Sequence, residues 1–382
     1  MSGSYPHFRL HLALGLLFGA VLATGAATGA WGSEGHLQQP VASHQNALPV
    51  PRISSDDAAL RWVAQSGDRW SALYTAQQFA SVTEALAGHY AGVGLWVTRS
   101  PDGSVSVSRV RPDGPAAQAA VGSGDRLLRI DGREVTGLPV TEVVALLRGT
   151  GPSAGSAVRL GLLSRGRVHD VVLHRQLLDA DDVVVDHPDA GITRIVLSAF
   201  TAGTGDQVVA AVRERRVLPG GERGKGILLD LRGNSGGLVD EAVASASAFL
   251  DGGPVASYRA DDGEPLWLTA ARGGDSSTPL VVLVDGGTMS AAELLTGALQ
   301  DRGRAVVVGS RTFGKAAVQQ PTTLPSGAVL ERTVGHYRTP AGRDLDGAGI
   351  TPDVLVPPAA GPQAAERTAI TVLDDLAGVD SQ

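Results

Sequence analysis

The pattern of hydrophobic and polar positions is most informative between residues 279 and 320. A β-branched apolar run at 281–284 stops at an Asp-Gly-Gly turn, which predicts a buried strand followed by a loop. Apolar residues then recur at helical spacing over 294–299, and a second apolar run covers 305–308. The stretch therefore predicts a strand, a helix and a strand in succession, with Ser290 at the first strand-to-helix junction.

The same alternation precedes this stretch. Alternating apolar positions predict a strand at 192–200, and a helical pattern follows at 205–216. A buried-type strand at 226–232 leads through a glycine-rich turn, 233–237, into a helix at 238–250. Repeated strand and helix units of this kind predict an α/β core in which the two strand–glycine–helix junctions face one another.

The N-terminal half of the chain has different patterns. Residues 53–90 follow a helical pattern that begins with Ser and Asp residues. Residues 89–175 hold short alternating strands separated by Gly/Asp turns, with a helical pattern inserted at 139–148. The segment 177–189 is predicted to be a linker, which separates this part from the α/β core.

Residues 1–31 are predicted to be a targeting segment. Arg9 precedes an almost continuous apolar stretch from Leu10 to Trp31, and a polar, Pro-punctuated linker follows at 32–52. Small residues between Ala23 and Ala30 suit a signal peptidase, while the length of the stretch also suits a membrane anchor of ~20 residues. A cleaved signal and an uncleaved anchor both stay open, and both place the remainder outside the cytoplasm.

Charge and composition exclude several classes of function. The formal net charge is −7 and no block of basic residues occurs, which argues against nucleic acid as a partner. The chain has no cysteine, which excludes a disulfide scaffold, a thiol nucleophile and a Cys-ligated metal. The histidines and acidic residues show no metal-ligand spacing, so we predict neither a metal nor a cofactor.

Lysine usage points to one candidate base. Lys225 and Lys315 are the only lysines among the 32 Lys and Arg residues. An ammonium can lose its proton at a reachable pH whereas a guanidinium cannot, so a chain that uses Arg elsewhere keeps Lys where chemistry needs it. Lys315, just past the second predicted strand of the 279–320 stretch, is therefore a candidate general base.

The region 91–176 resembles a PDZ domain. The matching features are the loop Gly92-Val93-Gly94-Leu95, a helix start at Pro115-Ala116-Ala117, and the segment from Gly122 to Gly132. The resemblance implies that main-chain N–H groups of the glycine loop take a terminal carboxylate, while the bound peptide adds a strand to the sheet edge.

The order of all these pieces resembles the carboxyl-terminal processing, or tail-specific, serine peptidases, over roughly residues 56–357. The matching segments are Asp68-Arg69-Trp70-Ser71, Asp230-Leu231-Arg232-Gly233-Asn234-Ser235-Gly236-Gly237, Thr312-Phe313-Gly314-Lys315 with Val318-Gln319, Tyr337 to Arg343, and Gly349 to Asp353. The resemblance implies an α/β multidomain fold. Its parts are a short N-terminal helical region (53–90), a PDZ domain (91–176), a crotonase/ClpP-like α/β serine peptidase core (177–360) and a C-terminal tail (361–382).

The resemblance also implies site residues. The family's nucleophile falls on Ser290, its general base on Lys315 and its base-orienting residue on Gln319. A serine hydroxyl needs a neighbouring base to become a nucleophile, and a lysine serves only if burial lowers its pKa from ~10.4. The expected oxyanion donors are main-chain N–H groups near the nucleophile, those of Gly236, Gly237 and Ala291. Glu293 is expected to give structural support.

Structural alternatives exist for the same residues. Ser290 and Glu293 form the pattern of a helix capping box, which predicts a serine that only satisfies helix N–H groups. Taken without the other motifs, Lys315 is equally typical of an ordinary surface lysine. His336, in a strand-like segment, is the one histidine of the core that would suit a Ser-His pair.

Three residues depart from the family pattern. Met289 replaces a small residue before the nucleophile, Ser235 stands where proline is common, and Ala316 stands where glycine is common. These departures bear on substrate preference and rate rather than on the class of reaction.

The preferred hypothesis is an exported serine endopeptidase that acts on protein substrates with apolar C-terminal tails. One alternative is a catalytically degenerate PDZ scaffold that binds C-terminal peptides. Another is a different acyl-chemistry enzyme: a crotonase-like acyl-CoA enzyme would not explain the PDZ-like region. A penicillin-binding type needs Ser three residues before Lys, where the chain has Glu222 and Thr312. The Ala-rich tail after Gly361 is a candidate helix for a homo-oligomer, and the N-terminal segment is the only candidate membrane contact.

Overall fold

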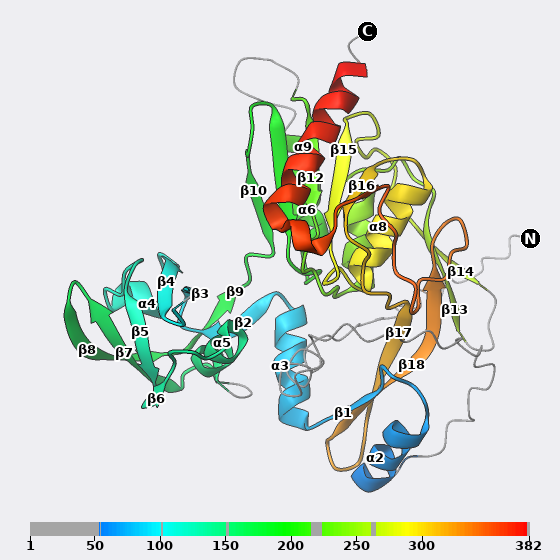
Figure 1. Cartoon of the computed structure of the whole chain (residues 1–382). Coiled ribbons are helices and arrows are strands. Elements are labelled where there is room, and N and C mark those ends of the chain that lie inside the picture. Colours follow the sequence, from blue (N-terminus) through cyan, green and yellow to red (C-terminus); the bar gives the residue numbers. More distant parts are fainter. Residues whose placement is uncertain are drawn as a thin grey trace, which may run out of the picture. The chain divides into compact units, whose positions relative to one another are not determined.

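The computed structural model describes residue 53 and residues 55–100, 102–149, 153–214, 224–260 and 265–379 (Figure 1). The predicted targeting segment and the linker at 32–52 lie outside these ranges. Among the described helices, none is both long and apolar enough to span a membrane. By internal contacts the chain divides into two units: residues up to Leu73 with 182–326 and 330 onward, and residues 74–181 with 327–329. The domain boundaries given above remain predictions.

The larger unit contains a six-stranded sheet that is parallel except at one edge. Its strand order is β10 (Val183–Asp186), β11 (Ile192–Leu197), β12 (Gly226–Asp230), β15 (Leu280–Val284), β16 (Val306–Gly309) and β19 (Val354–Leu355). β10 is antiparallel to β11, and the remaining neighbours are parallel. The strand, helix and strand predicted for 279–320 are confirmed.

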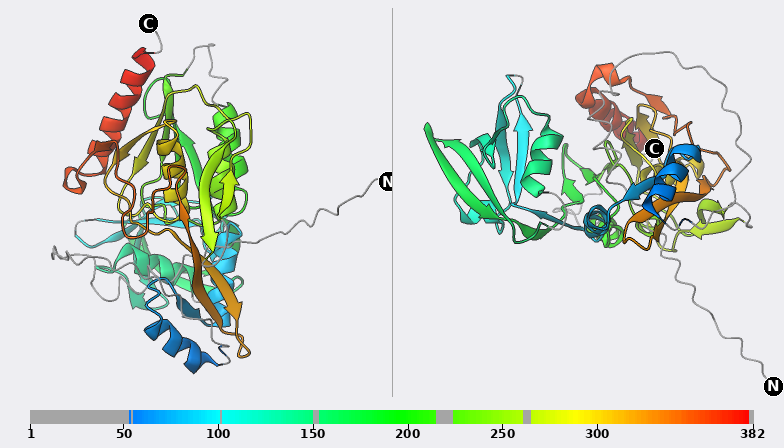
Figure 2. Two further views of the ribbon diagram at one scale, coloured as in Figure 1. Left: turned by 90° about the vertical axis from the view of Figure 1, so that its right-hand side faces the viewer. Right: turned by 90° about the horizontal axis from the view of Figure 1, so that it is seen from below.

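Helices cover both faces of this sheet (Figures 1 and 2). One face packs against α6 (Thr204–Glu214), α7 (Val239–Ser247) and α8 (Ala291–Asp301), and the other against α9 (Pro362–Val379), which follows the short helix η1 (Pro358–Ala360). Both faces are buried, so β15 is apolar throughout and β12 is apolar up to its last residue, Asp230. The helix predicted in the Ala-rich tail is confirmed as α9.

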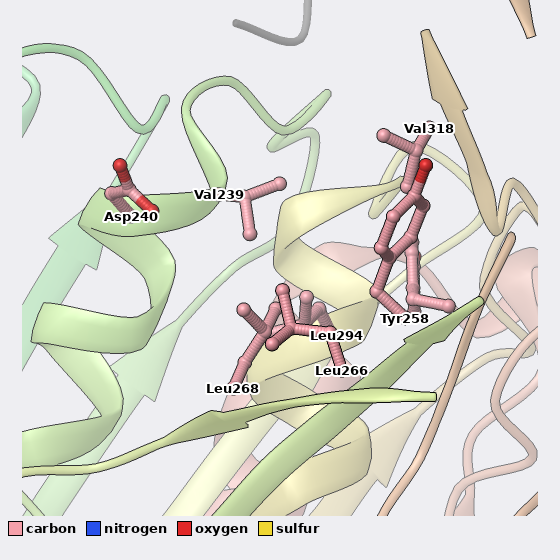
Figure 3. A pocket seen from close by; sticks show the side chains of 8 residues that line it. Val239, Asp240, Tyr258, Leu266, Leu268, Leu294 and Val318 are labelled. Carbon is pink, nitrogen blue, oxygen red and sulfur yellow. The ribbon is translucent and has the colours of Figure 1, made fainter. Parts of the chain in front are cut away.

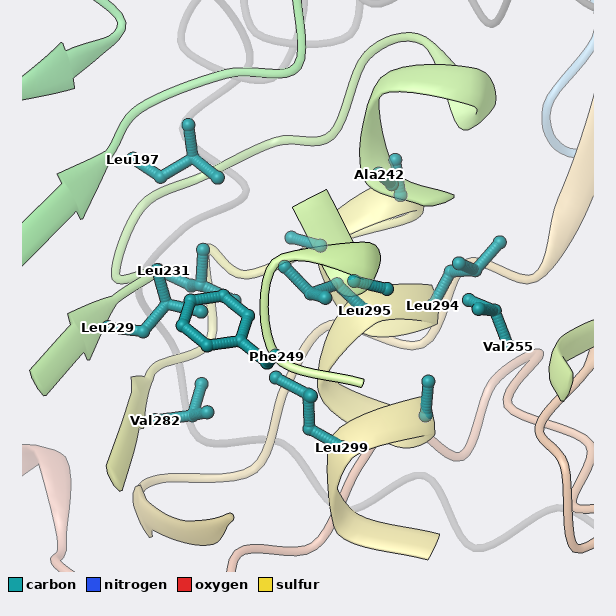
Figure 4. Packing of buried hydrophobic residues seen from close by; sticks show 14 of the residues in the cluster. Leu197, Leu229, Leu231, Ala242, Phe249, Val255, Val282, Leu294, Leu295 and Leu299 are labelled. Carbon is teal, nitrogen blue, oxygen red and sulfur yellow. The ribbon is translucent and has the colours of Figure 1, made fainter. Parts of the chain in front are cut away.

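Side chains along β15 alternate between the two faces. Val282 belongs to the cluster that includes Leu229 and the helix residues Leu295 and Leu299, as Figure 4 shows. Its neighbour Val281 belongs instead to the cluster under α9. This period of two fixes which face of each strand meets which helix, and it holds the ends of β12 and β15 in register.

A second sheet in the larger unit carries one wall of the site. Its strand order is β1 (Ala72–Tyr74), β18 (Val329–Arg338), β13 (Pro254–Ala260) and β14 (Leu266–Thr269), with β17 (Ala317–Thr323) also paired to β18. The N-terminal helix α2 (Asp56–Gln65) begins at Ser55, whose hydroxyl accepts from the Ala58 N–H. The prediction of a wholly helical 53–90 is wrong, because the strand β1 (Ala72–Tyr74) interrupts it. Three residues are too few to show a period, and a strand this short forms through partners distant in sequence.

The smaller unit is an antiparallel β-sheet with two helices. Its strand order is β3 (Leu95–Arg99), β4 (Val105–Val110), β5 (Arg126–Ile130), β7 (Ala157–Ser164) and β8 (Arg167–His174), with β6 (Arg133–Glu134) on β5. The helices α4 (Pro115–Gln118) and α5 (Val140–Arg148) confirm the two predicted helix positions, and α3 (Ala76–Leu86) precedes the sheet. β3 is an edge strand, as a peptide-binding sheet edge requires.

A separate strand pair joins the two ends of this unit. β2 (His89–Gly92) pairs with β9 (Gln176–Asp179) in antiparallel register. The prediction that 177–189 is a linker is therefore wrong, since the segment holds most of β9 and all of β10. β9 finds its partner β2 far away in the sequence, which a local pattern does not reveal, whereas β10 pairs with the next strand, β11.

Candidate active site

The two predicted junctions meet at the carboxyl ends of β12 and β15. Asn234 holds them together: its side-chain N–H donates to Leu197 O at 2.8 Å, and its main-chain O accepts from Met289 N at 2.9 Å. A Cβ placed on Gly236 would lie 3.0 Å from Ser290 Cβ. The glycine-rich turn and the serine are therefore in direct contact, as the sequence predicted.

The three predicted oxyanion donors differ in their present partners. The Gly236 N–H donates to Asn234 Oδ1 at 2.8 Å, within its own turn. Gly237 has φ +138°, and a Cβ there would lie 2.2 Å from Phe200 O, so only glycine fits. Ala291 is the first residue of α8, where a helix leaves its N–H groups without helical partners.

Ser290 has a backbone conformation that is unusual for a residue with a side chain. Its φ is 55° and its ψ is −117°, the region that glycine favours in tight turns. Such a conformation costs about 1–3 kcal/mol and is found at functional sites, including serine nucleophiles on strand-to-helix turns. The side chain is fully buried, and its Oγ makes no hydrogen bond within the described part of the chain. The hydroxyl faces the Glu293 N–H as in a capping box, but without a hydrogen bond of good geometry.

Lys315 is almost completely buried, with 1% of its surface exposed. Its Nζ donates to Gln319 Oε1 at 2.6 Å. Burial lowers the pKa of Lys315 from 10.5 to about 7, against the opposing charges of Glu331, Asp68 and Asp346. The interpretation of Lys315 as an ordinary surface lysine is therefore wrong.

Ser290 and Lys315 are not hydrogen-bonded to each other in this conformation, since the serine Oγ has no partner. Hydrogen bonds of a catalytic pair are often absent without substrate and form in the complex. What the structure supplies is a buried amine with a lowered pKa, an amide that fixes it, and a buried serine on a neighbouring junction.

Glu293 connects the two junctions through main-chain hydrogen bonds. Its Oε2 accepts from the N–H groups of Ser290 at 3.0 Å and Lys315 at 2.8 Å. Its Oε1 accepts from the Gly314 N–H at 2.8 Å and the Thr312 hydroxyl at 2.5 Å. Burial raises the pKa of Glu293, although all four contacts favour the ionised form. The predicted supporting role has a concrete geometry in these contacts.

Tyr337 makes the matching connection through carbonyl groups. Its hydroxyl lies 2.7 Å from Ser290 O and 2.8 Å from Lys315 O, and its ring is buried. The sequence marked Tyr337 only as part of a closing segment of the family and gave it no role. Asn234 was likewise only one letter of the glycine-rich motif.

The alternative base His336 does not point into this site. It is exposed and precedes Tyr337 on β18, so its side chain projects from the opposite face of the strand. A Ser290–His336 pair is therefore excluded in this conformation.

An apolar pocket lies beside the site (Figure 3). Its lining comes from α7, α8, β17, β18 and the β13–β14 hairpin: Val239, Asp240, Tyr258, Leu266, Leu268, Leu294, Val318 and Tyr337. Leu294 is one helical turn after Ser290, and Val318 precedes Gln319. The lining therefore includes residues of α8 and β17, the elements that follow Ser290 and Lys315 in the chain, although neither of these two residues lines the pocket. Asp240 supplies its one charged lining side chain.

The predicted peptide-binding loop lies between β2 and β3. Gly92 ends β2, Leu95 begins β3, and Gly94 has φ +73°. Within the described residues, the N–H groups of Val93 and Gly94 donate no main-chain hydrogen bond. Two consecutive free donors next to an edge strand suit the capture of a carboxylate.

In the described ranges, no group of three His, Asp or Glu residues lies close enough to hold a metal ion.

Comparison with known families gives two matches. The description Peptidase family S41 matches residues 191–356, and the description PDZ domain matches residues 85–162. The first range contains Ser290, Lys315 and Gln319, and the second contains the glycine loop.

Individual proteins are similar over most of the chain. The carboxy-terminal-processing protease of Bartonella bacilliformis is 33% identical over 303 residues, 78% of this chain and 68% of that protein. The carboxyl-terminal-processing protease of a Picosynechococcus species is 32% identical over 322 residues, 80% of this chain and 74% of that protein. The chloroplastic C-terminal processing peptidase of Tetradesmus obliquus is 30% identical over 323 residues, 80% and 69% respectively.

Two solved structures share the fold. The photosystem II D1 C-terminal processing protease matches with a TM-score of 0.51 and 31% identity, covering 84% of this chain and 86% of that chain. A putative S41 protease from Bacteroides fragilis matches with a TM-score of 0.55, covering 87% and 93%, and at 17% identity it bears on the fold alone. The predicted combination of a PDZ domain with an α/β peptidase core is confirmed.

Proposed function

Because the chain belongs to peptidase family S41, the carboxyl-terminal processing proteases, and is a serine-type peptidase with a PDZ domain, we propose that it is exported and cleaves protein substrates near their C-termini by a Ser-Lys mechanism. The observation that carries the mechanism is Lys315. Its amine is buried beside the Ser290 junction, its pKa is lowered to about 7, and it donates to an uncharged amide. About half of such a base is neutral at pH 7, so it can take a proton there without a strongly alkaline medium.

The proposed reaction is acyl transfer in two steps. Neutral Lys315 takes the proton of the Ser290 hydroxyl as Oγ attacks the substrate carbonyl. The protonated amine then returns that proton to the leaving amine, which breaks the peptide bond and leaves an ester on Ser290. Water, deprotonated by Lys315, hydrolyses the ester and restores both residues. Gln319 holds the amine without adding a charge that would raise its pKa.

The developing oxyanion needs preorganised donors. The Ala291 N–H, at the start of α8, and the Gly237 N–H are the favoured donors, because neither donates a main-chain hydrogen bond within the described part of the chain. The Gly236 N–H becomes available only if it leaves Asn234 Oδ1, which it contacts at 2.8 Å. We therefore rank Gly236 below the other two.

The apolar pocket supports a preference for apolar residues in the substrate. It lies one helical turn from the nucleophile, so it suits the side chain on the acyl side of the cleaved bond. This preference agrees with the proposed apolar C-terminal tails. Met289, at 6% exposure, precedes Ser290 in the chain and is the departure from the family pattern nearest in sequence to the nucleophile.

The PDZ domain is proposed to capture the tail and to gate the reaction. The free N–H groups of Val93 and Gly94 and the open edge of β3 support tail capture. Ser290 has no exposed surface, which supports a requirement for a conformational change before cleavage. Amidation of a substrate's C-terminal carboxylate should then weaken binding, whereas equal binding of free and amidated tails would remove the capture role.

Export is proposed from the sequence alone. The apolar segment at 1–31 supports either a cleaved signal or an anchor. Fractionation of cells, followed by N-terminal sequencing of the mature chain, distinguishes the two. The proposal that α9 joins copies of the chain into a homo-oligomer likewise comes from the sequence alone. Light scattering, which measures the mass of the particle in solution, tests it.

The central experiment measures cleavage of an unfolded protein with an apolar, uncharged C-terminus. The parent chain is compared with Ser290→Ala and with Lys315→Arg, which keeps a positive charge and a long side chain but cannot act as a base. Cleavage by the parent and inactivity of both folded variants support the mechanism. Binding of C-terminal peptides by all three chains without any cleavage would favour the degenerate PDZ scaffold instead.

A further inference from the structure

The segment Asp68–Ser71 marked the family resemblance but received no role from the sequence, and its contacts are specific. The Asp68 carboxylate accepts from the Thr333 N–H and the Thr333 hydroxyl, both at 2.8 Å. The same carboxylate accepts from the Trp70 N–H at 3.0 Å. The segment is thereby tied to β18, the strand that also carries Tyr337.

The Trp70 ring lies against the catalytic lysine. Its centroid is 4.9 Å from Lys315 Nζ and 5.9 Å from the centroid of the Phe313 ring. Its indole N–H donates to Asp346 Oδ1 at 3.2 Å. Trp70 is thus fixed on two sides and covers an amine that lies some 245 residues later in the sequence.

The main chain of Trp70 determines which way the Gln319 amide points. Gln319 Nε2 donates to Trp70 O, and Gln319 Oε1 accepts from Lys315 Nζ at 2.6 Å. A carbonyl oxygen can only accept, so the amide nitrogen has to face Trp70 and the amide oxygen has to face the lysine. A neutral amine that donates one proton to Gln319 keeps its lone pair for the Ser290 hydroxyl.

We propose that Asp68–Ser71 is a positioning element for the catalytic pair, in which the Trp70 carbonyl orients the Gln319 amide and the Trp70 ring keeps water from Lys315 Nζ. This inference rests on the proposed Ser-Lys mechanism. Trp70 makes no contact with Ser290 among the contacts described above, and it acts on the reaction through Lys315 and Gln319.

The charges around Lys315 determine the sign of the expected effect. Burial lowers the pKa of Lys315 most strongly, Glu331, Asp68 and Asp346 raise it, and Arg69 lowers it. Removing the Trp70 ring admits water to the amine, which raises the pKa towards 10.5. The ring also attracts the charged amine, but such attraction is worth about 0.5–2 kcal/mol and is smaller than the effect of burial.

The test uses the fact that the chain has two lysines. A sample labelled with 13C at the lysine ε-carbon gives one signal for Lys315 and one for Lys225, which is exposed and serves as an internal control. Titration of the full chain carrying Ser290→Ala is compared with the same chain carrying Trp70→Ala. The Lys315 midpoint should rise by about one pH unit or more, and the Lys225 midpoint should not move.

Rates give the second readout. In the chain with Ser290, Trp70→Ala should lower kcat at pH 7 about fivefold or more with little change in KM, and part of the loss should return at higher pH. Trp70→Phe keeps an aromatic ring but not the bond to Asp346, so its Lys315 midpoint should stay near that of the parent. Trp62→Ala, the same change in the preceding helix α2, is the matched control.

An unchanged Lys315 midpoint and pH profile in Trp70→Ala would overturn the inference. An equal shift in Trp62→Ala would also overturn it, because the effect would then be general loosening. If Trp70→Ala does not fold, Trp70→Phe becomes the deciding variant. The proposal is contradicted if Trp70→Phe shows the raised Lys315 midpoint and the lowered kcat that are predicted for Trp70→Ala. If the parent itself does not cleave, the proposed function fails, while the Lys315 titration still decides whether Trp70 positions the amine.

Discussion

The main-chain N–H groups of Ser290 and Lys315 donate to one and the same carboxylate oxygen, Glu293 Oε2, at 3.0 and 2.8 Å. The main-chain carbonyl oxygens of the same two residues lie 2.7 and 2.8 Å from the Tyr337 hydroxyl. Two residues from different strand ends are thus bridged on both sides of their peptide groups. Their relative position depends on Glu293 and Tyr337 as much as on the sheet.

Glu293→Gln should impair folding and activity together. Each carboxylate oxygen of Glu293 accepts hydrogen bonds from two donors. In the glutamine variant an NH2 group replaces one of these oxygens, and because an NH2 group only donates, it cannot pair with the two donors that it faces. We expect a loss of about 2–4 kcal/mol in the free energy of unfolding, measured by urea denaturation. Glu142→Gln, at the exposed ion pair with Arg133, is the control for an ordinary surface carboxylate. Equal losses in the two variants would contradict the bridging role.

Tyr337→Phe keeps the buried ring and removes only the hydroxyl. Two buried carbonyl groups then lose a partner, which should cost about 1–3 kcal/mol of stability. Because the change loosens the position of Ser290 relative to Lys315, kcat should fall more than KM rises. Steady-state kinetics beside thermal unfolding measure both effects. A stable variant with full kcat would show that the hydroxyl does not set the geometry of the pair.

Activity should depend on a base that titrates near neutrality. Burial lowers the pKa of Lys315 to about 7, and the neutral amine is the active form. Below that value kcat/KM should therefore fall about tenfold for each pH unit, and above it the rate should level off. The check is a pH profile of cleavage from pH 5 to 9 with a substrate that has no titrating group. A profile that rises only near pH 10 would point to an exposed, unperturbed lysine.

Lys315→Met should stabilise the chain while abolishing cleavage. The unfolded chain holds the lysine proton up to pH 10.5, but the folded chain releases it near pH 7, so the unfolding free energy rises between these values. Below pH 7 the buried charge costs the folded state about 5 kcal/mol at most, and loss of the contact with Gln319 offsets part of the gain. Urea denaturation at pH 6 should show a gain of about 1–3 kcal/mol.

The second lysine provides the control for that experiment. Lys225 is exposed, and its hydrogen bond to Asp374 raises its pKa. Lys225→Met should therefore give no gain in stability. A gain of equal size at both positions would reflect the added apolar side chain rather than relief of a buried charge.

Leu268→Phe should narrow the apolar pocket beside Ser290. Leu268 lies on β14 and lines the pocket, so a larger side chain should exclude bulky substrate residues before small ones. We expect kcat/KM for a Leu-containing cleavage site to fall about tenfold relative to an Ala-containing site. Trp267→Ala, at the neighbouring exposed position, does not line the pocket and should leave the ratio unchanged. An unchanged ratio in Leu268→Phe would place the substrate side chain elsewhere.

Local hydrophobic patterns in the sequence were sufficient to predict much of the fold. The apolar runs at 226–232 and 279–284 became β12 and β15 because a strand covered on both faces needs no polar side chain. The segments that were predicted wrongly, β1 and β9, are strands of three and four residues. Their pairing comes from partners distant in the chain, which leaves no period in their own residues.

The sequence by itself determined the membership of the family, the alternation of strands and helices, and the choice of Ser290, Lys315 and Gln319 as candidates. Only the tertiary structure decided that Lys315 is buried, and with it the direction of its pKa, because desolvation depends on neighbours from every part of the chain.

The structure alone also decided the contacts that hold the candidate site together. The bridges by Glu293 and Tyr337 and the contact between Trp70 O and Gln319 join residues that the sequence separates by up to 249 positions. Hydrophobic periodicity records only which face of an element is buried. Which side chains meet there is settled by packing between elements, and that information exists only once the chain has folded.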